Sequence, residues 1–218
     1  HTLLGGAAGG DVQQIVGVLR EPLAVPLFEG AWRQIVARHD VLRTAFRWAG
    51  DEGLAQEVRR EVALPIIVED WRSLAEDERV SRFATYCRDD WRRGFALDRA
   101  PLMRLTVLQW ADAEFRFVWT FHHALIDGRS YHLLLHEVFA VYEALQRGET
   151  ISLPASPPYR DYIAWLQGQD ATAAEAYWRE LLAGFTAPTP LPDLSPATPP
   201  TPDDDYGMQE LWLTEETT

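Results

Sequence analysis

The stretch FRFVWTFHHALIDGRS, residues 115–130, combines an aromatic strand pattern, two adjacent histidines and a polar turn that leads into a helix. Aromatic residues occupy every second position up to Phe121, and the side chains of a β-strand alternate between its two faces. A strand over 115–123 therefore places His123 on the aromatic face and His122 on the opposite face. Because adjacent side chains of a strand point apart, the two histidines do not predict a shared zinc site.

The turn after this strand holds Asp127 and Gly128, directly before a helical pattern. An aspartate here can cap the N-terminus of the helix or form a buried ion pair with an arginine, and both alternatives stay open. Glycine allows another backbone or a ligand to approach closely. His123 lies where the strand ends, and it is our candidate for a functional side chain in a pocket.

Apolar periodicity predicts alternating strands and helices along the rest of the chain. The long helix after the turn is expected to end at Gly148, because glycine commonly terminates helices. Strands are predicted at 11–19, 43–48, 63–71, 102–110 and 115–123, and helices at 27–40, 74–95, 128–148, 158–168 and 171–184. We expect Leu27, Ala31, Ile35 and Val36 to form the buried face of the first helix.

Composition excludes several classes of partner. The 218 residues carry a formal net charge of -13, whereas a nucleic-acid-binding surface needs a basic footprint. No apolar run reaches the length of a membrane span, and the first residues lack the plan of a signal peptide, so we expect a cytoplasmic protein. The single cysteine, Cys87, can build neither a disulfide framework nor a cysteine-based metal site.

The composition changes abruptly after residue 185. Residues 186–207 are rich in proline and acidic side chains, which predicts an extended linker. Residues 208–218 alternate apolar and polar side chains, as at the start of a strand in a further lobe. We therefore expect residues 1–185 to form one lobe, and we expect the chain to be a fragment of a longer protein.

Three segments, in the expected order, carry a family resemblance. HHALIDG at 122–128 matches the HHxxxDG motif of condensation domains from nonribosomal peptide synthetases. RHDVLRTAF at 38–46 is similar to the RHxxLRTxF segment of that family, and YRDYIAWLQ at 159–167 is similar to its YxDYxxWQ segment. Residues 91–109 also resemble the stretch that leads to the catalytic strand. The resemblance covers nearly the whole chain from about residue 12 onward.

This resemblance implies a chloramphenicol acetyltransferase-like lobe, an α/β fold (α+β sandwich) in which a mixed sheet is packed with helices. A full condensation domain has two such lobes with the active site in a tunnel between them. The chain corresponds to the N-terminal lobe and the start of the C-terminal lobe. The implied partners are the C-terminal lobe and the donor and acceptor peptidyl carrier proteins, whose phosphopantetheine arms carry the substrates. No cofactor or metal of the chain's own, no nucleic acid and no membrane are implied.

The resemblance also implies amide-bond formation at His123. An acceptor amine attacks a donor thioester, and a neutral imidazole can accept the proton that the amine loses. We expect His123 to act as this base or to position the amine, since aligning two tethered substrates contributes as much as proton transfer or more. His122, Asp127 and Gly128 are expected to support the site.

Asp127 is expected to pair with an arginine of the RHDVLRTAF segment. Arg38 and Arg43 are the two candidates, and the sequence does not choose between them. An uncompensated buried charge costs about 3–5 kcal/mol, so on this hypothesis Asp127→Ala damages folding more than chemistry.

Other functions share parts of the pattern. His123, Asp127 and Gly128 also fit the HxxxDG core of coenzyme A-dependent acyltransferases of the same fold. DGRSY at 127–131 is near the DGxSW of epimerization domains. A half-domain that docks carrier proteins without catalysis is a further alternative.

Two other groups of residues are expected to be structural. His132 and His136 lie four residues apart on the predicted helix, but no acidic ligand surrounds them, so packing or surface roles are expected. The aromatic and acidic side chains of the YRDYIAWLQ segment are expected to pack its helix and not to catalyse. They are Tyr159, Asp161, Tyr162 and Trp165.

Overall fold

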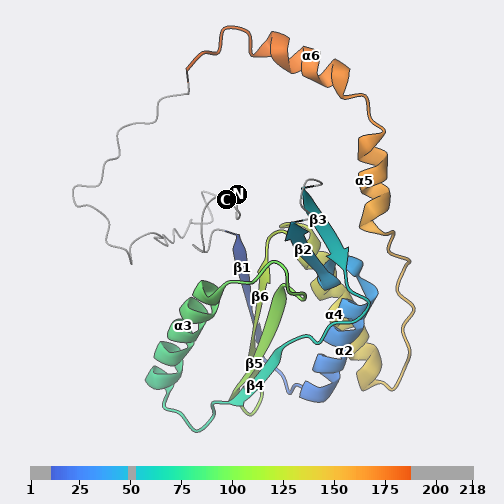
Figure 1. Cartoon of the computed structure of the whole chain (residues 1–218). Coiled ribbons are helices and arrows are strands. Elements are labelled where there is room, and N and C mark those ends of the chain that lie inside the picture. Colours follow the sequence, from blue (N-terminus) through green and yellow to red (C-terminus); the bar gives the residue numbers. More distant parts are fainter. Residues whose placement is uncertain (1–10, 49–52, 188–218) are drawn as a thin grey trace, which may run out of the picture. The chain divides into compact units, whose positions relative to one another are not determined.

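The structure is a computed structural model of the chain and describes residues 11–48 and 53–187 (Figure 1). It divides into two compact units with the boundary between Gln167 and Gly168. The first unit contains all the described strands and all the described helices but α6, which lies in the second unit. The expected terminal strand at 208–218 and nearly all of the expected linker lie outside the described residues.

The predicted order of helices and strands is confirmed, and one strand was missed. The strands are β1 (Val12–Leu19), β2 (Thr44–Trp48), β3 (Leu54–Val58), β4 (Ile66–Asp70), β5 (Met103–Ala111) and β6 (Glu114–His122). The α-helices are α2 (Val25–Arg38), α3 (Glu76–Arg93), α4 (Ser130–Gln146), α5 (Tyr159–Gln167) and α6 (Ala171–Leu181), and a 3₁₀ turn, η1 (Asp40–Arg43), precedes β2. The missed strand is β3, whose short sequence LAQEV has little apolar alternation.

The main sheet has the strand order β1-β6-β5-β4. β6 pairs antiparallel with β1 and with β5, whereas β4 pairs parallel with β5. β2 and β3 form a second, antiparallel sheet. The expectation of an α/β fold with a mixed sheet is therefore confirmed.

Helices cover both faces of the main sheet. α2 and α4 lie on one face and α3 lies on the other (Figure 1). Phe115, Phe117, Trp119 and Phe121 of β6 all belong to the core beneath α2 and α4, as their alternation predicts. The end of β6, with the loop that follows it, thus lies at the rim of this core.

Aromatic packing dominates the core. Phe28 and Trp32 of α2 are fully buried, and the Trp32 ring lies 4.9 Å from the ring of Trp119, centroid to centroid. Burial of each large side chain stabilises the fold by about 1.5–3 kcal/mol. The predicted buried face of α2 was incomplete, because it omitted both aromatic residues. Gly17 lies against the Phe117 ring, where a Cβ would approach within 2.0 Å.

The exit from α4 follows the prediction. Gly148 adopts a φ of 68°, a conformation that glycine enters without the steric cost met by other residues. Its backbone N–H donates to the Leu145 carbonyl, which satisfies one of the free carbonyl groups at the end of the helix.

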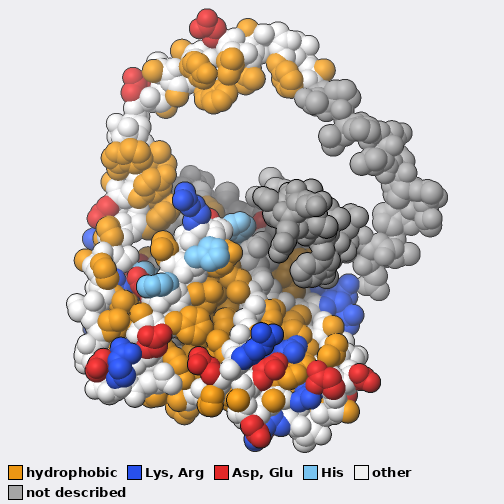
Figure 2. All heavy atoms as spheres, turned by 180° about the vertical axis from the view of Figure 1, so that it is seen from behind, with side chains coloured by type: hydrophobic (Ala, Val, Ile, Leu, Met, Phe, Trp, Pro, Cys, Tyr) orange, Lys and Arg blue, Asp and Glu red, His pale blue; other side chains and the backbone are white. Residues whose placement is uncertain are grey.

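Helix α5 differs from its prediction. Tyr159, Tyr162 and Trp165 are 52%, 49% and 58% exposed, and no residue of the helix is buried. Their rings contact one another in turn along one side of the helix, and Figure 2 shows apolar side chains gathered there. The expected packing role is therefore not seen within the described residues, and the segment presents an aromatic row on its surface.

Candidate functional site

His123 begins the loop that connects β6 to α4. Its backbone N–H donates to the Asp11 carbonyl at 2.6 Å, and its Nδ1 lies 2.8 Å from the Ile126 carbonyl oxygen. A carbonyl oxygen only accepts, so Nδ1 must carry the proton and Nε2 keeps its lone pair. The loop thus selects the tautomer in which an exposed nitrogen can accept a proton.

Two cavities adjoin His123. The larger has a volume of about 670 Å³ and is lined by the loop, by Arg38 and Phe46, and by Leu134 of α4, among others. The smaller, of about 200 Å³, lies between β1 and the start of α4 and is lined by residues that include Gln13. His123 lines both cavities, and Figure 2 shows histidine side chains gathered among apolar atoms on this face.

His122 has a different environment from its neighbour. It is 4% exposed, and its Nδ1 accepts a hydrogen bond of 3.0 Å from the backbone N–H of Ala124. Burial lowers its pKa, and the nearby His123 acts in the same direction, while Asp11 acts against them. His122 is therefore held neutral inside the scaffold, whereas His123 is exposed, as expected for adjacent residues that point apart.

Asp127 does not form the expected ion pair. Its Oδ1 accepts hydrogen bonds from the Ser130 hydroxyl at 2.7 Å and from the backbone N–H groups of Ser130 and Arg129 at 2.9 and 3.1 Å. These hydrogen bonds, that of the Ser130 hydroxyl above all, lower the pKa of the exposed Asp127 carboxyl. The capping alternative describes this geometry, and the expectation of a buried charge is wrong.

The two candidate arginines have other partners. Arg38 pairs with Glu137 of α4, Nε to Oε2 at 3.3 Å, and also donates to the Pro154 carbonyl. Arg43 pairs with Asp40 at 2.5 Å and donates to carbonyls just beyond β3. Each arginine joins segments near the larger cavity, and neither is paired with Asp127 in the described part of the chain.

A histidine outside the expected site also lines the larger cavity. His39 Nε2 lies 2.6 Å from Glu137 Oε2, the same oxygen that Arg38 contacts. Sequence reasoning missed this cluster, because Glu137 lies far from the RHDVLRTAF segment in the chain. The arginine–histidine dipeptide that begins that segment was the available signal.

Gly128 lines the smaller cavity, and the space beside it is open. A Cβ built on Gly128 would meet no atom within 4 Å. Close approach by the chain's own backbone therefore does not explain this glycine.

The described residues offer neither a metal cluster nor a membrane-spanning helix. They contain no group of three or more His, Cys, Asp or Glu side chains that could hold a metal ion. His132 and His136 are exposed on α4. Within the same ranges, no helix is both long and apolar enough to cross a bilayer.

A mixed sheet covered by helices on both faces, with an exposed histidine where an inner strand ends, defines the class as a chloramphenicol acetyltransferase-like acyl-transfer fold. The Condensation domain family model matches residues 10–217. The chain therefore belongs to the condensation domain family, whose general function in nonribosomal peptide synthetases is peptide-bond formation.

Similar proteins include several peptide synthases. A linear gramicidin synthase of Brevibacillus parabrevis is 40% identical over 179 residues, which cover 82% of this chain and 2% of that protein. Chondramide synthase cmdD of Chondromyces crocatus is 43% identical over 182 residues, which cover 83% and 4%. The chain thus spans only a few per cent of the length of these relatives.

Solved condensation domains share the fold. The starter condensation domain of rhizomide synthetase RzmA superposes with a TM-score of 0.73 at 26% identity, over 83% of this chain and 44% of that chain. An arginine-to-alanine mutant of that domain, in complex with C8-CoA, gives a TM-score of 0.74 at 26% identity, over 84% and 42%. The chain accordingly spans less than half of these solved chains.

Proposed function

We propose that this chain supplies the histidine-bearing lobe of a domain that joins a carrier-bound acyl or peptidyl thioester to a carrier-bound aminoacyl amine. One observation carries the proposal. His123 lines two cavities, and its proton is held on Nδ1, so that Nε2 is free to accept a proton. Two substrates that arrive from different sides can meet at this imidazole.

The chemistry balances around that nitrogen. The acceptor amine attacks the thioester carbonyl, a carbon–nitrogen bond forms, and Nε2 of His123 takes the proton that the nitrogen must lose. The tetrahedral intermediate then collapses, the carbon–sulfur bond breaks, and the imidazolium returns the proton to the leaving thiolate. The products are an amide and a free thiol, and His123 ends the cycle neutral.

The remaining residues support the histidine. Asp127 holds the start of α4, and His122 stays neutral within the scaffold, so neither exchanges protons with the substrates. Arg38 joins α2 to α4 at the larger cavity. We propose that the substrates come on phosphopantetheine arms of donor and acceptor carrier domains and that the chain acts in the cytoplasm.

The central test is a condensation assay with the complete domain. A donor loaded on one carrier protein and an acceptor amino acid loaded on another are mixed with enzyme, and carrier-bound product is followed by mass spectrometry. We expect His123→Ala to lower the rate by about 10²–10⁴-fold, the usual contribution of general acid–base catalysis. His136→Ala, which removes an exposed histidine of α4, is the matched control. Near-normal turnover of His123→Ala would exclude the catalytic role.

The second lobe is the proposed partner of the histidine-bearing lobe. The chain covers 44% of the rhizomide condensation domain, and α5 presents the aromatic row of Tyr159, Tyr162 and Trp165 on its surface. We expect the isolated chain to give no product and the complete domain to give product. Product from the isolated chain, lost with His123→Ala, would show that one lobe or an oligomer of it suffices.

A coenzyme A thioester is a second candidate donor. The observation that favours it is the rhizomide starter domain in complex with C8-CoA. The assay therefore has a second arm, in which octanoyl-CoA replaces the carrier-bound donor. Product in this arm alone would identify a lobe that starts a chain, and product in the carrier arm alone would identify one that extends it.

A further inference from the structure

Asp90 is a buried charged residue that the proposed reaction does not use. It lies in the last turn of α3 and is 6% exposed. α3 covers one face of the main sheet, whereas α2 and α4, which contribute to the larger cavity, cover the other (Figure 1). A carboxylate is expensive to bury, so its surroundings must explain its presence.

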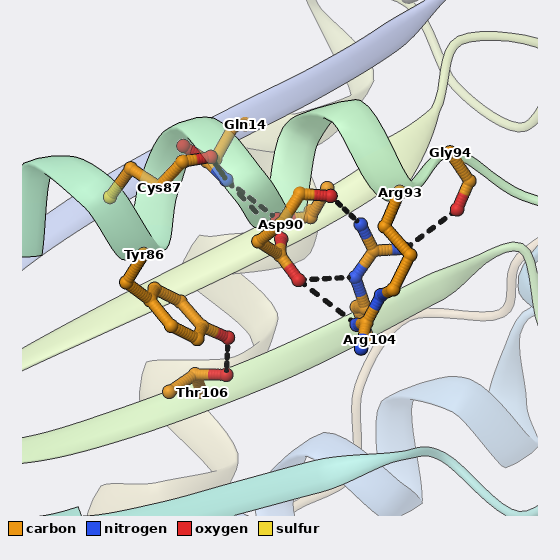
Figure 3. A network of polar contacts seen from close by, with 9 residues as sticks. Gln14, Tyr86, Cys87, Asp90, Arg93, Gly94, Arg104 and Thr106 are labelled. Atoms are coloured by element: carbon orange, nitrogen blue, oxygen red, sulfur yellow. Dashed lines mark hydrogen bonds and ion pairs between the residues drawn. The ribbon is translucent and has the colours of Figure 1, made fainter. Parts of the chain in front are cut away.

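Asp90 joins α3 to three neighbouring strands, as Figure 3 shows. Its Oδ1 accepts from Arg104 Nε of β5 at 2.6 Å. Its Oδ2 accepts from the Thr120 hydroxyl of β6 at 2.6 Å and from Gln14 Nε2 of β1 at 3.3 Å. Thr120 is the register partner of both Gln14 and Arg104, so these side chains form one row across the sheet. One carboxylate thus fixes the lateral arrangement of β1, β6 and β5.

Arg104 fixes the end of α3 against the same row. Its guanidinium donates to the Gly94 carbonyl at 2.9 Å and to the backbone carbonyl of Asp90. It also lies over the Phe95 ring, 4.3 Å from the centroid. Gly94 ends the helix at a φ of 58°, a conformation that suits glycine. The helix end therefore has a defined position on the sheet.

Stability alone does not account for this network. Taking two charges out of water costs several kcal/mol for each ion, and apolar residues of similar volume in place of a buried ion pair often leave a protein as stable or make it more stable. Hydrogen bonds differ from apolar contacts in being directional. The property that the carboxylate and its partners add is thus a specific geometry.

The geometry that they define leads to the reacting histidine. Thr120 precedes His123 by three residues, about 10 Å along a strand. Trp91, next to Asp90, donates from Nε1 to the Val12 carbonyl at 2.9 Å. The residue just before β1, Asp11, provides the carbonyl that holds the His123 backbone. The last turn of α3 therefore anchors both strands from which the position of His123 is set.

We propose that Asp90 is a positioning residue for condensation: through Thr120, Gln14 and Arg104 it holds the strand ends so that His123 keeps its hydrogen bond to Ile126 and presents Nε2 to both substrates. Asp90 contacts none of the reacting atoms. The inference rests on the proposed function, because it assigns a task to a residue remote from the chemistry.

The first test separates geometry from stability in the complete domain. The double variant Asp90→Leu/Arg104→Leu removes the charges and retains apolar volume. We expect a melting temperature close to that of the unmodified domain, a kcat at least tenfold lower and a KM that changes little. Arg88→Gln, on the exposed side of α3, is the control and should leave all three quantities unchanged.

The second test changes one group on β6. Thr120→Val keeps the shape and removes the hydroxyl, whereas Thr120→Ser keeps the hydroxyl. We expect kcat to fall severalfold in the valine variant and to be restored in the serine variant. The ¹⁵N signals of His123 should show a mixture of tautomers in the valine variant and one tautomer in the unmodified domain, a change that a purely structural role would not produce.

The outcomes distinguish the inference from the function on which it rests. If His123→Ala keeps its turnover, the proposed function fails. If His123→Ala is inactive while Thr120→Val keeps full kcat and one tautomer, the positioning role alone is overturned. The Thr120 variants decide the matter even if the double variant does not fold.

Discussion

β6 presents aromatic side chains to α2 and α4 on one face and a mixture of apolar and polar side chains to α3 on the other. On the first face, Trp119 contacts Trp32 and Phe121 ring to ring. On the second, Thr120 donates to the buried Asp90. The same strand is thus buried by bulk on one side and by directional hydrogen bonds on the other.

This contrast explains how the fold holds a reacting group at its rim. Apolar contacts are non-directional and scale with buried area, so they stabilise the sheet without fixing one register. Hydrogen bonds are satisfied only within narrow distances and angles, so they select a single arrangement. The aromatic face supplies stability and the polar face supplies position, and His123 follows the strand that has both.

The largest expected effect on stability is on the aromatic face. Trp119→Ala should lower the free energy of unfolding by about 3–5 kcal/mol, because it leaves a large cavity among fully buried rings. Chemical denaturation measures this loss. Trp119→Phe is the matched control: the Trp119 Nε1 has no hydrogen-bond partner among the described residues, so phenylalanine removes volume and no hydrogen bond. Equal losses in both variants would show that this face depends on more than volume.

The polar face should respond differently to single and paired changes. Asp90→Ala leaves the buried Arg104 without its carboxylate and should cost about 3 kcal/mol, the lower end of the usual range, since Arg104 keeps two backbone carbonyls. Asp90→Leu/Arg104→Leu should recover most of that loss. A double-mutant cycle by urea denaturation measures the coupling between the two residues. Additive losses would contradict the idea that stability and position are separate on this face.

Sequence periodicity predicted the aromatic face well. The alternation of Phe115, Phe117, Trp119 and Phe121 placed all of them correctly, because apolar alternation depends only on the strand's own geometry. The polar face could not be predicted in the same way. Asp90, Gln14 and Thr120 lie far apart in the chain, and their meeting depends on strand order and on the docking of α3.

The site shows the same limit. The motif identified His123 and its neighbours, and the alternation separated His122 from it. The partner of Asp127 was wrong, because a carboxylate next to a helix start is satisfied locally by the N–H groups of that start. The contact of Arg38 and His39 with Glu137 was missed, because it joins two helices whose relative position no local pattern reveals.

A smaller effect, on pH dependence, is expected at the border of the two faces. Burial lowers the pKa of His122, whereas an unfolded histidine titrates near about 6.5. The folded state therefore binds fewer protons than the unfolded state as the pH falls through that value, and stability falls with it. His122→Asn keeps an acceptor for the Ala124 N–H and does not titrate. Melting temperatures between pH 8 and pH 5 should fall less steeply in this variant, and His136→Asn should keep the original slope.

The smallest expected effect concerns the turn that leads from β6 to α4. Asp127 is exposed and accepts hydrogen bonds at the start of α4, so asparagine, which caps helices about as well, should serve nearly as well near neutral pH. Asp127→Ala should lower the melting temperature slightly, because two backbone N–H groups lose their acceptor. Hydrogen bonds to the carboxylate lower the pKa of Asp127, so its contribution is present above the ordinary aspartate range and is lost as the pH falls through the lowered value. The asparagine variant should lack this acid-dependent loss. If asparagine destabilised the fold as much as alanine at neutral pH, the negative charge itself would be required, and the turn would belong with the ionic face of the sheet and not with a local cap.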